Sequence, residues 1–382
     1  MLIQRFKSCD INKDAEAIRG DVRAFLAEAL RDRAPVLRAQ SWMGFDAEFS
    51  RKLGERGWIG MTWPKRYGGG EKSAFARYVV IEELLAAGAP VSAHWIADRQ
   101  SGPLLLRFGS DAQKEFFLPA ICRGELFFCI GMSEPNAGSD LASIRTTAQR
   151  VDGGWRLNGS KLWTTNAHHS HYMITLVRTS GRSEDRHGGL SQFIVDLKAP
   201  GVTVRPIVDL TGEEHFNEVF FEDVFIAEDR LVGDEGQGWQ QVTAELAYER
   251  SGPERFLSSF ALFTELIRRA GDTPSERQAI QIGRLTAQLV ALRRMSLSVA
   301  GLLDQHDNPA VEAACVKDLG VGFEQDLPEA AQALFDIEPC IDNGTGYAQT
   351  LAYLTQMAPS FSLRGGTREI LRGIIARGLG LR

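Results

Sequence analysis

Cysteine is scarce in this sequence, and its few copies are scattered along the chain. The 382 residues include five cysteines, and no two of them are spaced as a CxxC pair. An odd number without paired spacing argues against a disulfide framework and gives no zinc-site pattern. We therefore expect the protein to work in a reducing compartment, the cytoplasm.

Long apolar runs and long runs of positive charge are also missing. No uninterrupted apolar stretch reaches the length that crosses a bilayer. The first residues, MLIQRFKSCDINKD, carry charges where a secretory signal has an apolar core. The formal net charge is −6, so neither nucleic acid nor an anionic membrane is expected as the main partner.

Three regions of the chain differ in the spacing of their apolar residues. Residues 1–124 and 233–382 repeat them every three or four positions, which predicts helices, among them one over residues 310–335. Residues 125–232 show short alternating runs with turn residues between them, including a run over residues 202–207, and these predict a β-barrel or sandwich. We expect an N-terminal helical domain, a middle β domain and a C-terminal antiparallel helix bundle with these limits.

A polar turn rich in small residues follows an apolar run near the start of the middle region. The run ends at Ile130, and the turn reads SEPNAGSD from Ser133 to Asp140. Small residues let a backbone approach a flat ligand closely, and exposed N–H groups and hydroxyls offer hydrogen bonds to it. The pattern is typical of a ligand-binding loop, although an ordinary surface turn has the same composition.

A second segment, WRLNGSKLWTT, runs from Trp155 to Thr165. Asn158-Gly159 stands in it between two runs that hold aromatic and apolar residues, and this is a strong hairpin signal. We therefore predict a hairpin turn at these two residues. Beyond it, Trp163-Thr164-Thr165 places an aromatic ring before two hydroxyls, a surface that suits a flavin.

Three histidines, His168, His169 and His171, follow this segment closely. Imidazole is a common metal ligand, so a metal site is conceivable. No carboxylate or thiolate lies nearby at ligand spacing, which favours solvated residues of a β-hairpin.

Together, the turn and the second segment resemble the flavin-binding middle domain of the acyl-CoA dehydrogenase family. That family carries a T/S-E-P-x-A-G-S-D turn and then a G-x-K-x-W-I/T-T/S segment, and both are present here in order. The segment FNEVFFEDV, from Phe216 to Val224, extends a resemblance that covers nearly the whole chain. The resemblance implies the same order of helical, β and helical-bundle domains, with FAD as cofactor. It implies FAD contacts from Ile130, Met132, Ser133, Gly138, Ser139, Trp163, Thr164, Thr165, Arg277, Thr367 and Glu369.

The reaction that the resemblance implies is oxidation of an acyl-CoA thioester to the 2,3-enoyl-CoA. A carboxylate removes the α proton, a hydride passes from the β carbon to flavin N5, and the electrons go on to an electron-transferring flavoprotein. Because the α proton is weakly acidic, the thioester carbonyl needs hydrogen-bond donors, and the base needs a dry pocket that raises its pKa. An acyl-CoA substrate and that flavoprotein are therefore the expected partners.

The usual base of the family is missing from this sequence. Many members carry a Y-E-G-T segment in the last helical region, whereas this chain has Arg364-Gly365-Gly366-Thr367. A second family position lies on the first helix of the bundle, directly before an arginine, where this chain has Glu249-Arg250. We expect Glu249 to be the catalytic base and Ser139, Arg250 and Gly365 to bind the substrate. The alternative is a merely structural Glu249–Arg250 ion pair.

The motifs that bind the adenine end of the flavin in many members are not intact here. Where a neighbouring subunit would supply an Arg-x-x-Phe pair, this chain has Ser275-Glu276-Arg277-Gln278, which leaves Arg277 as a candidate for the pyrophosphate. A flavin site shared between subunits implies a homodimer or homotetramer, or a hetero-oligomer. Three functions stay open: a dehydrogenase that uses Glu249; an oxidase, monooxygenase or thioester lyase on the same fold; and a non-catalytic subunit.

Overall fold

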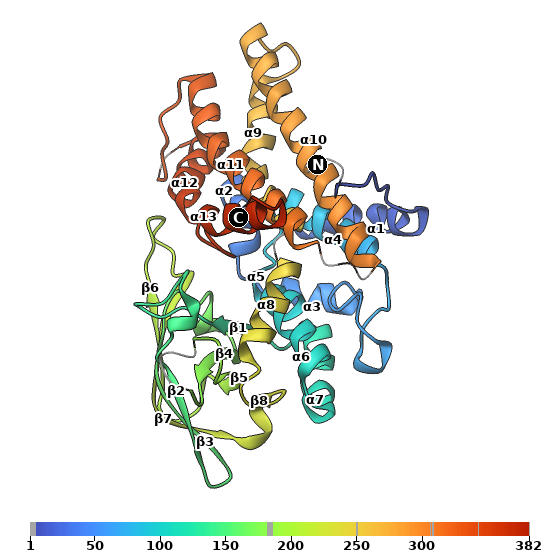
Figure 1. Ribbon diagram of the computed structural model, residues 1–382. Helices are drawn as coiled ribbons and strands as arrows, with labels where there is room; N and C mark the ends of the chain where they lie inside the picture. The colour runs from blue at the N-terminus through green and yellow to red at the C-terminus, as the bar shows by residue number, and fades with distance from the viewer. Residues whose placement is uncertain are drawn as a thin grey trace. The chain divides into compact units, whose positions relative to one another are not determined.

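The chain forms two compact units in a computed structural model (Figure 1). The structure describes residues 5–181, 186–249, 251–305, 307, 309–342 and 344–381, with only the backbone of residues 245–249. The helical unit comprises Met1–Phe45, Lys72–Val91 and Ala247–Arg382, and the mixed unit comprises Asp46–Glu71 and Ser92–Leu246. The order of helices, β-sheet and helices along the chain confirms the predicted fold class, while the limits of the three domains remain a prediction.

The helical unit is built around one long helix, α11. Its helices are α1 (Lys13–Ala29), α2 (Pro35–Gln40), α4 (Ala74–Ala86), α9 (Phe260–Ala270), α10 (Glu276–Asp304), α11 (Ala310–Phe335), α12 (Gly346–Phe361) and α13 (Arg368–Gly378), with short turns η2 (Ser41–Met43) and η8 (Pro253–Arg255). The small and apolar side chains of α11 pack against α9, α10, α12 and α13. A capping box, in which Ser275 and Gln278 each accept from the other's N–H, begins α10 and satisfies two end groups of that helix.

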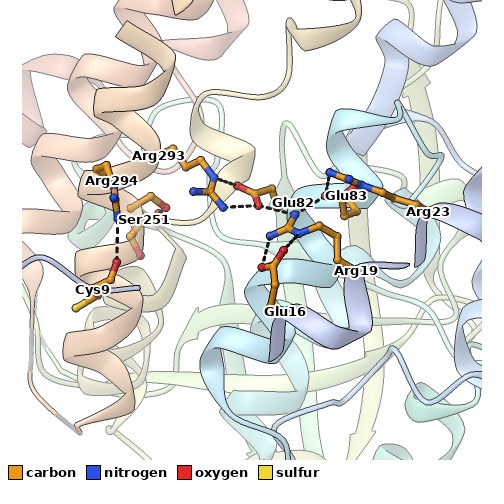
Figure 2. A network of polar contacts seen from close by, with 10 residues as sticks. Cys9, Glu16, Arg19, Arg23, Glu82, Glu83, Ser251, Arg293 and Arg294 are labelled. Carbon is orange, nitrogen blue, oxygen red and sulfur yellow. Dashed lines mark hydrogen bonds and ion pairs between the residues drawn. The ribbon is translucent and has the colours of Figure 1, made fainter. Parts of the chain in front are cut away.

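Charged side chains also join three helices of the helical unit (Figure 2). Glu82 on α4 accepts from Arg293 Nε on α10 at 2.6 Å and from Arg19 Nη1 on α1 at 3.0 Å. Glu83 pairs with Arg19 and with Arg23, whose Nε lies 2.8 Å from Glu83 Oε2. Both carboxylates are buried and need cationic partners there, so the network fastens α1 and α10 to α4.

The mixed unit contains one β-sheet (Figure 1). Its strands are β1 (Phe128–Gly131), β2 (Thr147–Val151), β3 (Gly154–Lys161), β4 (Tyr172–Arg178), β5 (Leu190–Asp196), β6 (Val202–Ile207), β7 (Phe216–Ala227) and β8 (Leu231–Val232). They are ordered β6-β7-β3-β2-β4-β5-β8, and β1 pairs in parallel with β4. The helices and turns are α3 (Ala47–Glu55), η3 (Lys65–Tyr67), α5 (Ser92–Ile96), the π-helical η4 (Ala97–Ser101), α6 (Gly102–Phe108), α7 (Asp111–Cys122), η5 (Leu141–Ser143), η6 (Ala167–His169), η7 (Glu228–Arg230) and most of α8 (Gly238–Glu249).

Alternating side chains on these strands form the core of the mixed unit. On β3, Trp155 and Leu157 are buried while Arg156 between them is exposed. Trp155 meets Phe193 of β5 edge to face, with ring centroids 5.2 Å apart. This inward set holds the sheet that carries the candidate ligand-binding loops. None of the described helices is long and apolar enough to cross a membrane.

The predicted hairpin turn at Asn158-Gly159 is wrong. Both residues lie inside β3, and the turn between β2 and β3 is at Asp152-Gly153, where Gly153 has a φ of +73°. The pairing of β3 with β7 instead shifts between Leu157 and Gly159. Asn158 Nδ2 donates to Asp223 Oδ1, and the Asp223 N–H donates to Asn158 Oδ1, both at 2.9 Å. Asn158 thus fastens an irregularity in a continuing strand, while Asp-Gly supplies the turn.

Candidate functional site

The polar turn that follows β1 closes on its own backbone. The Glu134 N–H donates to the Ala137 carbonyl at 2.9 Å, and the Ala137 N–H donates to the Glu134 carbonyl at 3.1 Å. Gly138 and Ser139, just beyond this closure, are exposed, and a methyl group at Gly138 would meet nothing within 4 Å. At the base of the turn, Ile130, Met132 and Ser133 are half-buried. The turn therefore presents open backbone and a hydroxyl to solvent.

A buried ion pair fixes the base of this turn. Lys161, the last residue of β3, has no exposed surface, and its Nζ lies 2.8 Å from Glu134 Oε1 and 3.1 Å from the Met132 carbonyl. Glu134 also accepts from the N–H groups of Arg145 at 2.6 Å and Thr146 at 3.0 Å. Burial raises the pKa of Glu134, but Lys161 and these donors outweigh it and hold the pKa below its usual value. Burial lowers the pKa of the Lys161 ammonium to about 8.

Lys161 is expected to make the free energy of unfolding depend on pH in the alkaline range. Its pKa is about 8 in the folded chain against a usual 10.5, so between these values the unfolded chain binds the extra proton. The free energy of unfolding therefore gains a slope of up to about +1.4 kcal/mol per pH unit across that window. Lys161→Met removes the titrating group, so urea unfolding over roughly pH 7–10 should show a smaller slope for the variant. Equal slopes for the two proteins would contradict this assignment.

Trp163 stands beside the turn in a strained backbone conformation. Its φ of +58° lies in the left-handed region, which costs a residue with a side chain about 1–2 kcal/mol. Its side chain is 57% exposed, and its ring meets Phe216 edge to face at 5.9 Å. The Leu162 N–H donates to the Ser133 carbonyl at 2.9 Å, which joins this segment to the turn. A strained, outward-facing indole next to an open loop is typical of a preorganised ligand contact.

The backbone that follows Trp163 is anchored to β7 and to the residues just before it. The Thr164 N–H donates to the Asn217 carbonyl at 3.0 Å, and the Asn166 N–H donates to the His215 carbonyl at 2.8 Å. Thr164 is buried, and its Oγ1 has no hydrogen-bond partner in the described part of the chain. Thr165 is half-buried. The candidate flavin residues on β1, on the turn and at the end of β3 are therefore brought together in the mixed unit.

The three histidines have structural partners. His168 Nδ1 lies 2.9 Å from Asn217 Oδ1, and since that oxygen only accepts, His168 is the donor. His171 Nδ1 accepts from the Phe127 N–H at 3.1 Å, and burial lowers the pKa of this imidazole. His169 lies against His168 with ring centroids 3.9 Å apart. Among the described residues, no three His, Cys, Asp or Glu side chains gather as they would around a metal ion.

In the helical unit, the segment that contains Gly365 has a left-handed backbone. The φ angles are +63° at Gly365 and +98° at Gly366, so any other residue at Gly365 would be strained. Buried Lys317 on α11 donates from Nζ to the Gly366 carbonyl. Arg364 Nη2 lies 2.9 Å from Oε2 of Glu324, also on α11. The backbone itself therefore favours glycine where the Y-E-G-T segment has its glutamate.

Two other candidates follow that segment at the start of α13. Thr367 is the residue before the helix and is half-buried, and Glu369 is exposed in the first turn. Hydrogen bonds from its own N–H and from Thr367 lower the pKa of Glu369, and a carboxylate is favoured at this end of a helix. Asp318 on α11 accepts from Arg368 Nε at 2.8 Å. Contacts of Gly366 and Arg368 with α11 thus hold the segment that contains Gly365, Thr367 and Glu369 against that helix.

Arg277 lies on a different part of the helical unit. Its exposed side chain lines a groove of about 680 Å³ between α10 and α11, and its Nη2 donates to the Ala333 carbonyl at 3.0 Å. Lys317, which holds the Gly366 carbonyl, precedes Ala333 on α11 by a distance of about 24 Å along the helix axis. Within one chain, Arg277 is therefore not brought together with the Gly365 segment.

The side chains of the predicted base and of its neighbour lie outside the described residues. Glu249 is the last residue of α8, but its side chain lies outside the described residues, as does all of Arg250. The chain resumes at Ser251, whose carbonyl accepts from Ser296 Oγ of α10. The roles of Glu249 and Arg250 remain predictions.

Sequence reasoning missed the residues that hold the candidate site segments in place. Lys161 stands inside the G-x-K-x-W segment, so that motif could have identified it as a buried partner for an acidic residue. Glu324 and Asn217 meet Arg364 and Thr164 across 40 and 53 residues of sequence. Local spacing gives no signal for such contacts.

Two family models match the chain. One, "Acyl-CoA dehydrogenase, N-terminal domain", matches residues 12–125, and the other, "Acyl-CoA dehydrogenase, middle domain", matches residues 129–224. Together they cover more than half of the sequence. The chain belongs to the acyl-CoA dehydrogenase family. The enzymes of this family are FAD-dependent oxidoreductases that act on CH–CH groups.

Individual acyl-CoA dehydrogenases resemble this chain over their whole length. IpdE1 of Mycobacterium tuberculosis is 35% identical over 389 residues, which covers 97% of this chain and 98% of IpdE1. Among solved structures, the Tcur3481-Tcur3483 steroid ACAD is 26% identical with a TM-score of 0.87, covering 98% of this chain and 100% of that one. The ChsE4-ChsE5 complex from Mycobacterium tuberculosis is 28% identical with a TM-score of 0.84 and the same coverage. The likeness to acyl-CoA dehydrogenases thus extends through the C-terminal helices.

Proposed function

We propose that this chain binds FAD and oxidises an acyl-CoA thioester to the 2,3-enoyl-CoA, passing the electrons to an electron-transferring flavoprotein. The observation that carries the proposal is Trp163, which exposes its ring from a strained backbone directly beside the open Ser133–Asp140 turn. A soluble fold has little reason to hold a large aromatic ring outward at a conformational cost unless a ligand covers it. Membership of the acyl-CoA dehydrogenase family supports FAD as that ligand.

The residues around Trp163 fit a flavin. The indole offers a flat apolar surface, and the turn offers free backbone groups with the Ser139 hydroxyl. Once bound, FAD would supply the hydride acceptor of the reaction. In this proposal its contacts in the mixed unit are Ile130, Met132, Ser133, Gly138, Ser139, Trp163, Thr164 and Thr165, and those in the helical unit are Thr367, Glu369 and Arg277.

Glu249 removes the α proton of the substrate in this proposal. Gly365 carries no side chain and cannot serve as the base, and its left-handed backbone disfavours a replacement there. Arg250 would align Glu249 or the thioester through its planar guanidinium. Ser139 and Gly365 would border the acyl-CoA.

The names of similar structures support one class of substrate. The steroid ACAD, as its name indicates, supports an acyl group attached to a bulky ring system. The absence of a side chain at Gly365 is compatible with such a group. We therefore expect ring-bearing acyl-CoA esters to react faster than straight-chain esters of similar size.

The chain is also proposed to act as part of an oligomer. Two of the similar structures carry paired protein names, Tcur3481-Tcur3483 and ChsE4-ChsE5, which supports a partner subunit beside the homodimer or homotetramer alternative. The groove that holds Arg277 lies along α10, where Ile280 and Val290 are about half exposed. A neighbouring subunit over this face would cover those residues and bring Arg277 to a flavin that it shares.

The visible spectrum of the purified chain is expected to be that of a bound flavin, and it tests the proposal directly. Anaerobic addition of an acyl-CoA ester should then bleach the flavin band, with a ring-bearing ester and a straight-chain ester compared at equal concentration. Co-expression with a candidate partner subunit controls for an incomplete site. A chain that stays colourless with excess FAD, alone and with the partner, would overturn the proposed function.

A further inference from the structure

Asn217 holds both backbone groups of Thr164, the residue next to Trp163. Its carbonyl accepts from the Thr164 N–H at 3.0 Å, and its side-chain Nδ2 donates to the Thr164 carbonyl at 2.9 Å. Asn217 has no exposed surface. Water is therefore excluded from the Asn217 side, and the loss of the amide would leave the buried Thr164 carbonyl without this donor.

His168 completes the hydrogen bonds of the Asn217 amide. An asparagine side chain could be turned over so that its oxygen faces Thr164. The Thr164 carbonyl can only accept, so the Asn217 amino group faces it at 2.9 Å and Oδ1 faces His168, whose Nδ1 donates to it at 2.9 Å. His168 is only half-buried, which makes it the accessible end of the arrangement.

The other side of Trp163 is held independently. The Leu162 N–H donates to the Ser133 carbonyl, so one hydrogen bond holds the chain before Trp163 and two hold Thr164 after it. These anchors on both sides restrict the backbone of Trp163, which has a φ of +58° and exposes its indole. Removal of one anchor would allow the backbone to leave the left-handed region.

We propose that Asn217, supported by its hydrogen bond with His168, is a positioning residue that keeps Trp163 in its ligand-facing conformation. We call the hydrogen bonds of Asn217 to Thr164 and His168 the clamp. The inference rests on the proposed function in that the ligand is FAD, but the clamp itself is a property of the chain without ligand. One member of the histidine cluster that suggested a metal site in the sequence thus has a different use, since His168 holds the amide that is bonded to Thr164.

The test uses the full chain labelled with 5-fluorotryptophan. The ¹⁹F resonance of residue 163 is assigned by its loss in Trp163→Phe, and it is recorded before and after FAD is added. Asn217→Leu, which is close to asparagine in shape but has no donor, is expected to shift or broaden this resonance in the chain without FAD. It should also raise the dissociation constant of FAD roughly ten- to hundredfold, since the strain at Trp163 is no longer held.

Asn158→Leu is the matched control. Asn158 also makes two hydrogen bonds of 2.9 Å between β3 and β7, with Asp223, so its loss tests general destabilisation of the same strand pair. It is expected to lower the melting temperature while leaving the residue 163 resonance and FAD affinity unchanged. His168→Ala supplies a second variant at a half-buried position, with the same change in the resonance at a smaller amplitude.

The outcomes separate the clamp from the proposed function. A wild-type resonance at residue 163 in a folded Asn217→Leu chain overturns the clamp, whatever the melting temperature. If Asn217→Leu does not fold, His168→Ala decides, and an unchanged resonance in that variant overturns the clamp. A wild-type chain that binds no FAD refutes the proposed function, whereas the resonance of the ligand-free chain still tests Asn217.

Discussion

Glu249→Gln is expected to abolish the reduction of bound flavin by acyl-CoA while the chain still folds and binds FAD. The amide has nearly the same shape as the carboxylate, but it cannot accept the α proton usefully. The rate of flavin reduction in anaerobic single turnovers should fall by a factor of about 10²–10⁴ or more, the usual contribution of a general base. Arg250→Lys is expected to be milder, because it keeps the charge and loses only the planar fork.

Glu369→Gln tests the alternative base in the same experiment. Glu369 is an exposed carboxylate on the helix that follows the Gly365 segment, so it is the next candidate if Glu249 is not the base. A merely structural Glu249–Arg250 pair predicts the opposite pattern, with a lower melting temperature for either change and nearly normal reduction per folded molecule. Wild-type reduction in Glu249→Gln would move the assignment to Glu369 or to altered chemistry.

Arg364→Met is expected to cause the largest loss of stability among the changes considered. Arg364 Nη2 lies 2.9 Å from Glu324 Oε2 and 2.8 Å from Ser258 Oγ, and its guanidinium carbon lies 4.4 Å from the centroid of the Trp42 ring. Glu324 has no exposed surface, so removal of the cation leaves a buried charge. Such a loss costs about 3–5 kcal/mol, or roughly 6–20 °C in melting temperature for a unit of this size.

The double variant Glu324→Gln, Arg364→Met is the matched control. Glu324 Oε1 accepts from the Ser258 N–H at 2.7 Å, and a glutamine keeps that acceptor without the charge. Most of the lost stability should therefore return, in either thermal or urea unfolding. A double variant as unstable as Arg364→Met would show that the packing of the Arg364 side chain, and not the buried charge, carries the effect.

The pH dependence of the Arg364→Met deficit gives a second check. Burial raises the pKa of Glu324 above 4.5 in the folded chain, so this group favours folding at low pH and loses that contribution as the pH rises above about 4.5. Removing Arg364 pushes the pKa further in the same direction. The deficit should therefore shrink as the pH falls toward 4.5, and a constant deficit would contradict the assignment.

The sequence predicted a helix or strand well where the spacing of its own apolar residues marks where it begins and ends. Residues 310–335 and 202–207 have the predicted limits as α11 and β6, because the spacing of apolar residues reports which side is buried. The hairpin at Asn158-Gly159 failed because two signals competed. Asp152-Gly153 makes the turn, and nothing local reveals that Asn158 is occupied by Asp223, 65 residues away.

The candidate site likewise contains residues that a local motif indicates and residues that only the folded chain brings to it. The motifs could name the turn residues and Trp163 as candidates because these residues belong to continuous segments. Lys161 and Asn217, which hold those segments, act through contacts that only the folded sheet creates. The left-handed backbone at Trp163 is also invisible in a sequence, because tryptophan has no preference for it and the surrounding anchors impose it.

The charge network around Glu82 bears on the order in which a ribosome can complete the two units. The mixed unit has all of its residues once synthesis reaches Leu246, whereas Glu82 waits for Arg293 on α10. At ordinary elongation rates the interval between residues 91 and 293 is roughly 10–40 s. For most of that time α1 and α4 would have mainly each other to bury their apolar and acidic faces. The nascent N-terminal helices are therefore the segment that we expect a chaperone to bind, and the sheet that carries the candidate flavin contacts can fold before them.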